Sequence, residues 1–141
     1  MFMAADLSPA EYQALAEFRY QIRRFLHFSE QAAAAAGLEP AQHQMLLALK
    51  GLALQDQETS IRLLSERLQL RHNSAVGLVD RLAARGFVKR NRGEKDRREV
   101  YISLTPEGEE ILRQLSLHHR AELRSTGPAL VDALNQVLSF D

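Results

Sequence analysis

The spacing of the apolar residues changes at Gly86. Before that glycine, residues 73–85 repeat apolar side chains at steps of three and four, which is the period of an α-helix. After it, "FVKR" and "REVYISL" alternate apolar and polar residues as a β-strand does, and the turn-rich "NRGEKDR" lies between them. The sequence therefore predicts a helix followed directly by a two-stranded hairpin.

Helical patterns precede this pair. One helix is predicted over residues 9–36, with Ser8 at its start and Gly37 as the left-handed residue after it. A second is expected over 40–54 and a short third over 61–70, followed by the turn "RHNS", which also supplies an N-cap. At about 1.5 Å per residue the first helix would be roughly 40 Å long. This exceeds what a domain of this size needs to cover its own core, so part of its apolar face is expected to meet a second subunit.

Helical residues also follow the hairpin. "TPEG" is typical of a helix start, because Thr105 can cap, Pro106 fits the first position and Glu107 lies at the positive end of the helix dipole. This helix is predicted to end near Arg124, where "STGP" breaks it, and a last helix is expected over 130–138.

Residues 60–104 thus follow the order short helix, tight turn, helix, hairpin. In a helix-turn-helix the second helix enters the major groove of DNA, and a hairpin behind it forms a wing along the neighbouring backbone or minor groove. The predicted fold class is mainly α with a small β-hairpin wing (α+β), a winged helix-turn-helix whose lobe spans 40–104 of a single domain, 1–141.

The basic residues are concentrated in this lobe. The 141-residue chain has 18 Lys or Arg and 18 Asp or Glu, a net charge of zero. Between Arg62 and Arg98, however, eleven basic residues face only four acidic ones, a surplus of seven. This distribution favours a nucleic-acid partner, which the net charge alone would not.

The sequence offers little support for other classes of function. The absence of cysteine excludes disulfides and thiolate metal sites. There is no apolar run long enough for a membrane span and no secretory leader, so we expect a cytoplasmic protein with no membrane partner. No phosphate loop, catalytic carboxylate pair or activated nucleophile appears, so we expect no enzyme, no cofactor and no metal. His118 and His119 are adjacent on a helix and would need further ligands, so exposed helix surface is the preferred interpretation.

The outward face of the helix over 73–85 carries groups that can read DNA. Asparagine can pair bidentately with adenine, serine and histidine can hydrogen-bond bases or phosphates, and valine can pack on a thymine methyl. A glycine inside a helix costs roughly 1 kcal/mol relative to alanine, and a close approach to DNA would account for it. The competing interpretation is a solvated face with an accidental glycine. The predicted contacts are Arg71, His72, Asn73, Ser74, Val76, Gly77 and Arg81.

The hairpin carries the second set of candidate contacts. Arginine is attracted to a narrow minor groove, and lysine or arginine beside it can neutralise phosphates. The predicted wing residues are Arg92, Lys95, Asp96, Arg97 and Arg98. Asp96 either orients a neighbouring arginine, such as Arg81 or Arg98, or is a solubilising charge on a loop.

The stretch "SERLQLRHNSAVGLVDRLAARGFVKRNRGEKDRREVYISLTPEG" resembles the recognition helix and wing of the MarR (multiple antibiotic resistance regulator) family, including "DRR" and "LTPEG". The resemblance implies a homodimer held by dimerisation helices in 1–36 and 105–141, bound to a pseudo-palindromic operator in double-stranded DNA. It carries over Asn73, Ser74 and Gly77 on the helix, with Asp96 and Arg97 in the wing. Oxidation-sensing members use a cysteine, which this chain lacks.

Members of that family often bind small aromatic or phenolic anions, so the resemblance also implies a small-molecule effector. The candidate pocket residues are Tyr20, Arg24, His27 and His43. For His43 a surface or satisfied histidine is the competing interpretation, and the arginines of "FRYQIRRF" are better explained by solvent or ion pairs.

The resulting hypothesis is a sequence-specific, dimeric transcriptional repressor that a small ligand would release from DNA. The alternative is a winged-helix module for protein interaction without specific DNA binding. Charge reversal at Arg97 and Arg98 would separate the two, because it should abolish only DNA retention.

Overall fold

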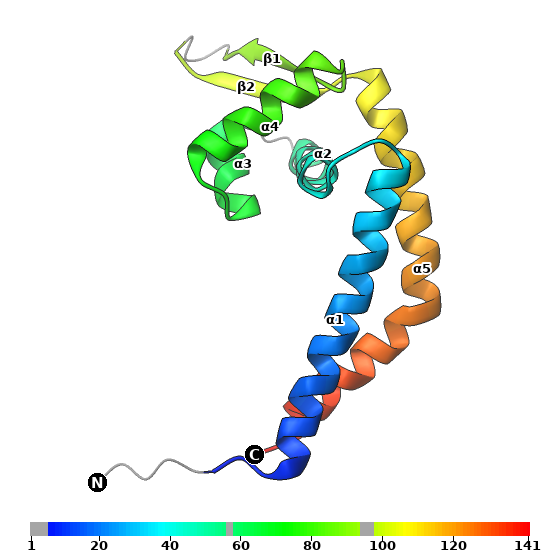
Figure 1. Cartoon of the computed structure of the whole chain (residues 1–141). Coiled ribbons are helices and arrows are strands. Elements are labelled where there is room, and N and C mark those ends of the chain that lie inside the picture. The colour runs from blue at the N-terminus through cyan, green and yellow to red at the C-terminus, as the bar shows by residue number, and fades with distance from the viewer. Residues whose placement is uncertain (1–5, 56–57, 94–97) are drawn as a thin grey trace, which may run out of the picture. The chain divides into compact units, whose positions relative to one another are not determined.

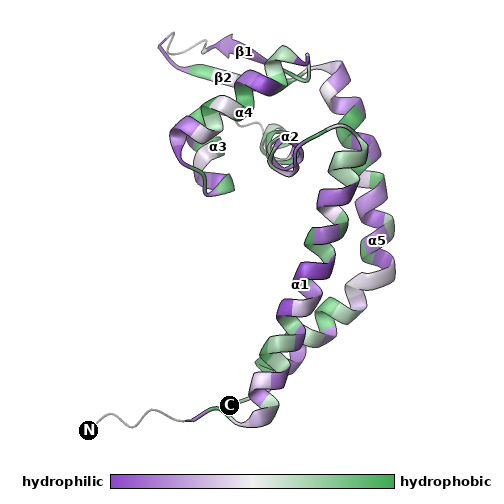
Figure 2. Cartoon of the chain, in the orientation of Figure 1, coloured by the Kyte–Doolittle hydropathy of each residue, from purple (hydrophilic) through white to green (hydrophobic). Residues whose placement is uncertain are grey.

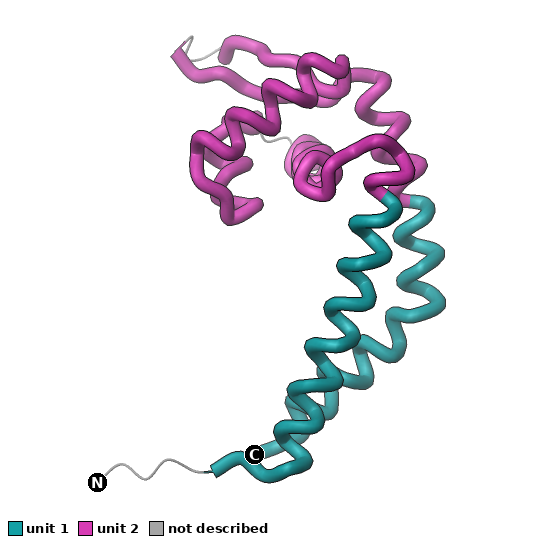
Figure 3. The backbone as a smooth tube through the Cα atoms, in the orientation of Figure 1, with its two compact units in different colours: residues 1–32, 117–141 teal, residues 33–116 magenta. Residues whose placement is uncertain are grey.

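The computed structural model describes residues 6–55, 58–93 and 98–141 (Figure 1). These residues form two compact units, shown in Figure 3. We call residues 33–116 the winged unit, and residues 1–32 with 117–141 the helical unit. The elements in chain order are α1 (Pro9–Ala35), α2 (Pro40–Ala53), α3 (Ile61–Leu68), α4 (His72–Ala84), β1 (Val88–Arg92), β2 (Val100–Leu104) and α5 (Pro106–Leu138).

The winged unit packs α2, α3 and α4 together with the hairpin. β1 and β2 are antiparallel, with Val88 opposite Leu104 and Arg92 opposite Val100. The Ile102 N–H donates to the Thr59 carbonyl at 2.8 Å, which fixes the free edge of β2 to the residues before α3. The largest fully buried side chains come from the three helices: Met45, Leu46, Leu64, Val79 and Leu82. The predicted fold class, mainly helical with one hairpin, is confirmed.

Among the described residues, three helices end through a residue with positive φ. Gly37 has φ of +80° and Gly86 of +79°, as expected for the glycines after α1 and α4. α3 ends in the same way, but through Gln69 at φ +53°. The N–H of Leu70 then bonds to the Ser65 carbonyl at 2.9 Å. A left-handed conformation strains a residue that has a Cβ, so the tight turn between α3 and α4 is made against local preference.

The predicted cap of the helix after the hairpin is confirmed. Thr105 Oγ1 accepts from the Gly108 N–H at 3.1 Å, and the Thr105 N–H donates to the Phe87 carbonyl at 3.1 Å. Gly108 is buried against that carbonyl, because a Cβ built on it would lie 2.0 Å from the Phe87 oxygen. The start of α5 is therefore fixed to the residue that precedes β1.

The helical unit pairs α1 with the second part of α5 (Figures 1 and 3). His119 Nε2 lies 2.8 Å from Ser29 Oγ, and its ring meets those of Phe25 and Phe28 with centroids 6.0 and 5.3 Å apart. Several large apolar side chains of the unit remain exposed: Leu7, Tyr12, Leu15, Tyr20, Leu26, Leu117, Leu123, Val131, Leu134, Leu138 and Phe140. Figure 2 shows hydrophobic and hydrophilic residues interspersed along both helices of the unit.

The predicted break at "STGP" is wrong. α5 is one helix from Pro106 to Leu138 with Pro128 inside it, and Figure 1 shows it bending in its orange part. Proline has no N–H for the Arg124 carbonyl, and its ring crowds that turn, which bends a helix without ending it when the flanking turns are held. Thr126 Oγ1 donates to the Glu122 carbonyl at 2.9 Å, and Ala133 beyond the proline is buried. Local sequence could not show this support.

Among the residues that the structure describes, no helix is both long and apolar enough to cross a membrane.

Candidate nucleic-acid interface

α4 has the inward and outward faces that its sequence predicts. Ala75, Leu78, Val79 and Leu82 are buried in the winged unit. The valine and the two leucines contribute about 1.5–3 kcal/mol each when fully buried, so the placement of α4 rests on these contacts. On the opposite side Arg71, His72, Asn73, Ser74 and Arg81 are exposed, while Val76 and Gly77 are half-buried.

The N-cap of α4 falls within "RHNS" as predicted, but on the arginine and not on a residue with a capping side chain. α4 begins at His72, and the cap position is Arg71, whose side chain makes no capping bond. The left-handed turn at Gln69 is so short that Asn73 and Ser74 already lie in the first helical turn. Their side chains are therefore not placed at the cap position, where they would bond the helix's own amides.

The start of α4 is consequently electropositive. The first turn holds no acidic residue, and Arg71 and His72 lie at the positive end of the helix dipole. Helix starts usually carry a carboxylate there, because the first N–H groups and the dipole both attract an anion. An external anion such as a phosphate would supply the negative charge that the first turn of α4 lacks.

The hairpin places further basic side chains beside α4. Lys89, Arg90 and Arg92 on β1 are exposed, and so is Arg98 before β2. Figure 2 shows β1 as mostly hydrophilic. Lys95, Asp96 and Arg97 lie outside the described residues, and their predicted roles stay predictions.

Two ion pairs involve adjacent residues of α4. Asp80 pairs with Arg90 of β1, which links the recognition helix to the hairpin. Arg81 pairs with Glu39 before α2, with Nη2 and Oε2 3.0 Å apart. Sequence reasoning missed both pairs, because the partners lie ten and forty-two residues apart and no periodicity connects them. The suggestion that Arg81 pairs with Asp96 is untested, but its carboxylate partner in the structure is Glu39.

A further arginine of this region is tied to the backbone. Arg85 donates to the Gly37 carbonyl, and its guanidinium lies over the Phe87 ring at 4.9 Å from the centroid. Arg62 lies 3.9 Å from Glu66 on α3. The surplus of basic residues in 62–98 therefore overstates the charge available to a partner, since some of it has internal contacts.

Gly77 lies beneath the end of Arg81. A Cβ added at Gly77 would meet Arg81 Nη1 at 3.3 Å, which is the far end of a flexible side chain. The structure thus gives Gly77 a second neighbour besides the predicted DNA backbone. Because the arginine can move, this contact alone does not require glycine.

The predicted effector residues are distributed over both units. Tyr20, Arg24 and His27 are exposed on α1, where the Arg24 guanidinium lies 5.7 Å from the Tyr20 ring centroid. His43 on α2 is 2% exposed, with Gln44 Nε2 3.4 Å from its Nδ1, so His43 is not a surface histidine but a buried one with a polar neighbour. That the four residues line one pocket stays a prediction.

His118 and His119 lie beside aromatic and polar side chains of α1. His119 contacts Ser29, and the His118 ring lies 6.2 Å from that of Phe28. Within the described part of the chain, no three His, Cys, Asp or Glu side chains gather as a metal ion would need.

Known proteins provide the comparison for this arrangement. Residues 36–99 match the model of the MarR family. The HTH-type transcriptional repressor YetL of Bacillus subtilis is 30% identical over 101 residues, which are 72% of this chain and 59% of that protein. The chain spans between 32% and 60% of the length of the curated relatives that it matches.

Solved structures share the fold. The crystal structure of AbsC, a MarR family transcriptional regulator from Streptomyces coelicolor, superposes with a TM-score of 0.76 at 21% identity and covers 96% of this chain and 94% of that one. A mutant of MepR from Staphylococcus aureus bound to an oligodeoxyribonucleotide has a TM-score of 0.65 at 18% identity, with coverage of 95% and 98%. The named relatives are transcriptional regulators, and residues 36–99 of this chain are similar to the MarR family.

Proposed function

We propose that this chain is a sequence-specific, dimeric repressor that binds duplex DNA through α4 and the hairpin. The observation that carries the proposal is the electropositive start of α4, which has no acidic residue of its own and lies in the same unit as a basic strand. The Asp80–Arg90 pair connects the two elements, so they would meet DNA as one surface. MepR, which shares the fold, has been solved with an oligodeoxyribonucleotide.

The two elements would have different tasks. Asn73 and Ser74 would contact base edges in the major groove and carry the choice of sequence. Arg71, Arg92 and Arg98, together with Lys95 and Arg97, would contact phosphates or the minor groove and carry affinity. His72, Val76 and Gly77 complete the face, and Arg81 lies on its flank.

The test separates the recognition of a DNA sequence from the general affinity for DNA. Fragments that the protein retains are selected from a random duplex library, and binding is measured by fluorescence anisotropy at physiological salt. Asn73→Ala should weaken the selected duplex by about 5- to 150-fold, the value of one bidentate base contact, and change random duplex little. Arg92→Gln should weaken both duplexes alike and lower the slope of log K against log salt by about 0.9.

A control distinguishes these effects from a general change of charge. Arg62→Gln removes an exposed arginine of α3 that already faces Glu66, and it should leave the preference between the duplexes unchanged. A wild-type protein that does not prefer the selected duplex over random DNA at physiological salt would refute the specific regulator and favour a protein-interaction module.

The dimer is proposed from the exposed apolar residues of the helical unit. Two copies would cover part of the face that includes Leu123, Leu134 and Leu138. Leu134→Arg should then give a monomer in sedimentation velocity. Leu54→Arg makes the same change at an exposed leucine of the winged unit, outside the proposed dimer face, and should leave the dimer intact. A selected site without two-fold symmetry would contradict the dimer on DNA.

Repression and release are further parts of the proposal. YetL, the relative reported above, is a repressor. A small aromatic or phenolic acid, bound near Tyr20, Arg24, His27 or His43, would change the spacing of the two recognition helices and lower affinity. Release of the selected duplex by one member of a panel of such acids would support this, and repression is measured with a reporter gene behind that duplex. Such a regulator would act in the cytoplasm.

A further inference from the structure

Glu39 holds an arginine of the proposed DNA-binding helix. The residue stands just before α2, and its carboxylate lies 3.0 Å from Arg81 on the flank of α4. The two side chains are 53% and 52% exposed, so water and other anions reach both of them. The pair is therefore open to exchange with an external anion.

The pair is not needed to hold α4 in place. That helix is fixed by the buried side chains of Leu78, Val79 and Leu82, whereas an exposed ion pair changes an equilibrium by about five-fold at most. The start of α2 also has its own bond, since the Glu39 N–H donates to Gln42 Oε1 at 2.8 Å. The Glu39 carboxylate thus has two contacts: it completes the capping box at the start of α2 with the backbone of Gln42, and it holds the Arg81 guanidinium.

The Arg81 side chain can move from Glu39 to the proposed DNA-facing surface of α4. Its guanidinium already lies over Gly77, one turn closer to the start of α4, where a Cβ would approach Nη1 to 3.3 Å. Because Gly77 has no side chain, the surface between Arg81 and Asn73 is open along that stripe of the helix. A phosphate or a guanine edge there would offer the planar guanidinium a bidentate partner.

We propose that Glu39 is an internal competitor for DNA, which holds Arg81 in the free protein and which DNA displaces. The inference rests on the proposed function, because it requires α4 to face DNA. Glu39 would thus set the affinity of the regulator from a position outside the helix-turn-helix.

The test is a double-mutant cycle on DNA binding. Glu39→Gln should raise affinity about two- to five-fold, the range of an exposed ion pair. Arg81→Gln should lower affinity and reduce the salt slope by about 0.9, as for one lost phosphate contact. In the Arg81→Gln background, Glu39→Gln should then change nothing.

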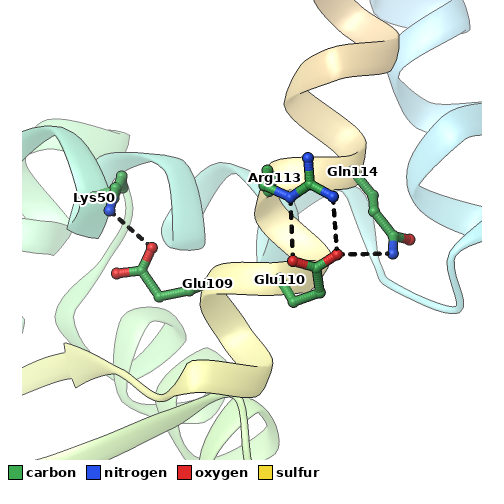
Figure 4. A network of polar contacts seen from close by, with 5 residues as sticks. All are labelled: Lys50, Glu109, Glu110, Arg113 and Gln114. Carbon is green, nitrogen blue, oxygen red and sulfur yellow. Dashed lines mark hydrogen bonds and ion pairs between the residues drawn. The ribbon is translucent and has the colours of Figure 1, made fainter.

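A matched control comes from α5. Glu110 and Arg113 form a second exposed pair of the same kind, with Nε and Oε2 3.1 Å apart, on a different element of the winged unit (Figure 4). Glu110→Gln removes the same charge and should leave DNA affinity unchanged. Unfolding midpoints of all variants are measured, and Glu39→Ala serves as a second removal of the carboxylate.

Each contrary outcome has one meaning. An unchanged or lowered affinity for both Glu39 variants would overturn the competitor, and so would an equal rise in the Arg81→Gln background, since that is a general charge effect. If the wild type and every variant lack DNA binding, the proposed function fails instead.

Discussion

Gly108→Ala should destabilise the winged unit although the glycine lies in a helix. A Cβ at this position would lie 2.0 Å from the Phe87 oxygen and 3.0 Å from its carbonyl carbon, so backbone has to move by about 1 Å. That shift strains the contact at about 1–3 kcal/mol. It also weakens the bonds of Thr105 to the Phe87 carbonyl and to the Gly108 N–H, both 3.1 Å long, at about 1 kcal/mol each. Alanine's higher helix propensity returns about 1 kcal/mol. The expected net loss is about 2–4 kcal/mol.

The assay is urea unfolding followed by circular dichroism, with Gly51→Ala as the matched variant. Gly51 is exposed in α2, and a Cβ there would meet nothing within 4 Å, so the same substitution should stabilise by about 0.5–1 kcal/mol. The two stability changes are expected to have opposite signs because a backbone carbonyl faces Gly108 and nothing faces Gly51. If Gly108→Ala is neutral or stabilising, the close approach of α5 to Phe87 is wrong.

Substitutions at three other positions test separate features. Gln69→Gly should raise the free energy of unfolding by about 0.5–1 kcal/mol in the same assay, because glycine adopts the left-handed conformation without strain. Gln69→Val should lower the free energy of unfolding. Equal effects of the two substitutions would contradict the φ of +53°. Gly77→Ala should stabilise by about 0.5–1 kcal/mol, since only the mobile end of Arg81 must move, yet weaken binding of the selected duplex in anisotropy; unchanged binding would remove Gly77 from the interface. The pKa of Glu110 is lowered by hydrogen bonds from Arg113 and Gln114, so this contribution to stability is complete above the unfolded value of 4.5 and is lost as pH falls through the lower folded value. An NMR titration of Arg113→Met should show that pKa returning toward 4.5, and an unmoved pKa would mean that the pair does not form in solution.

The elements of the fold could be predicted because each is specified locally. The periods of the apolar residues placed α2, α3, α4 and the hairpin within one or two residues of their observed bounds. Glycines and hydroxyl caps at helix ends act through bonds to residues three to five positions away. The helix-end roles of Gly37, Gly86 and Thr105 could therefore be predicted from the neighbouring sequence.

The errors arose where local preference meets distant contacts. The proline at position 128 reads as a helix end, but the turns around it are held by packing in the helical unit. Gln69 does not resemble a glycine, and its left-handed conformation follows from the need to turn α3 into α4 within three residues.

The candidate site could be predicted as a surface but not as a set of contacts. Which side of α4 faces outward follows from its period, whereas the partners of Asp80 and Arg81 depend on tertiary placement. Charge counting gave every arginine of the lobe the same weight. The structure separates those with internal partners, such as Arg81 and Arg90, from Arg71 at the start of α4, which lies where an incoming anion would be stabilised.

Pro128 changes what maintains the end of α5. A helix normally extends one backbone hydrogen bond at a time, so each turn supports the next. At Pro128 that succession is interrupted, because the Arg124 carbonyl receives no amide from it. The bonds of the neighbouring turns continue, since α5 is one helix to Leu138, but the missing bond and the crowded ring weaken that turn. The last ten residues of α5 therefore rest on side-chain packing as well as on the backbone, and beyond the buried Ala133 several of their side chains are apolar and exposed.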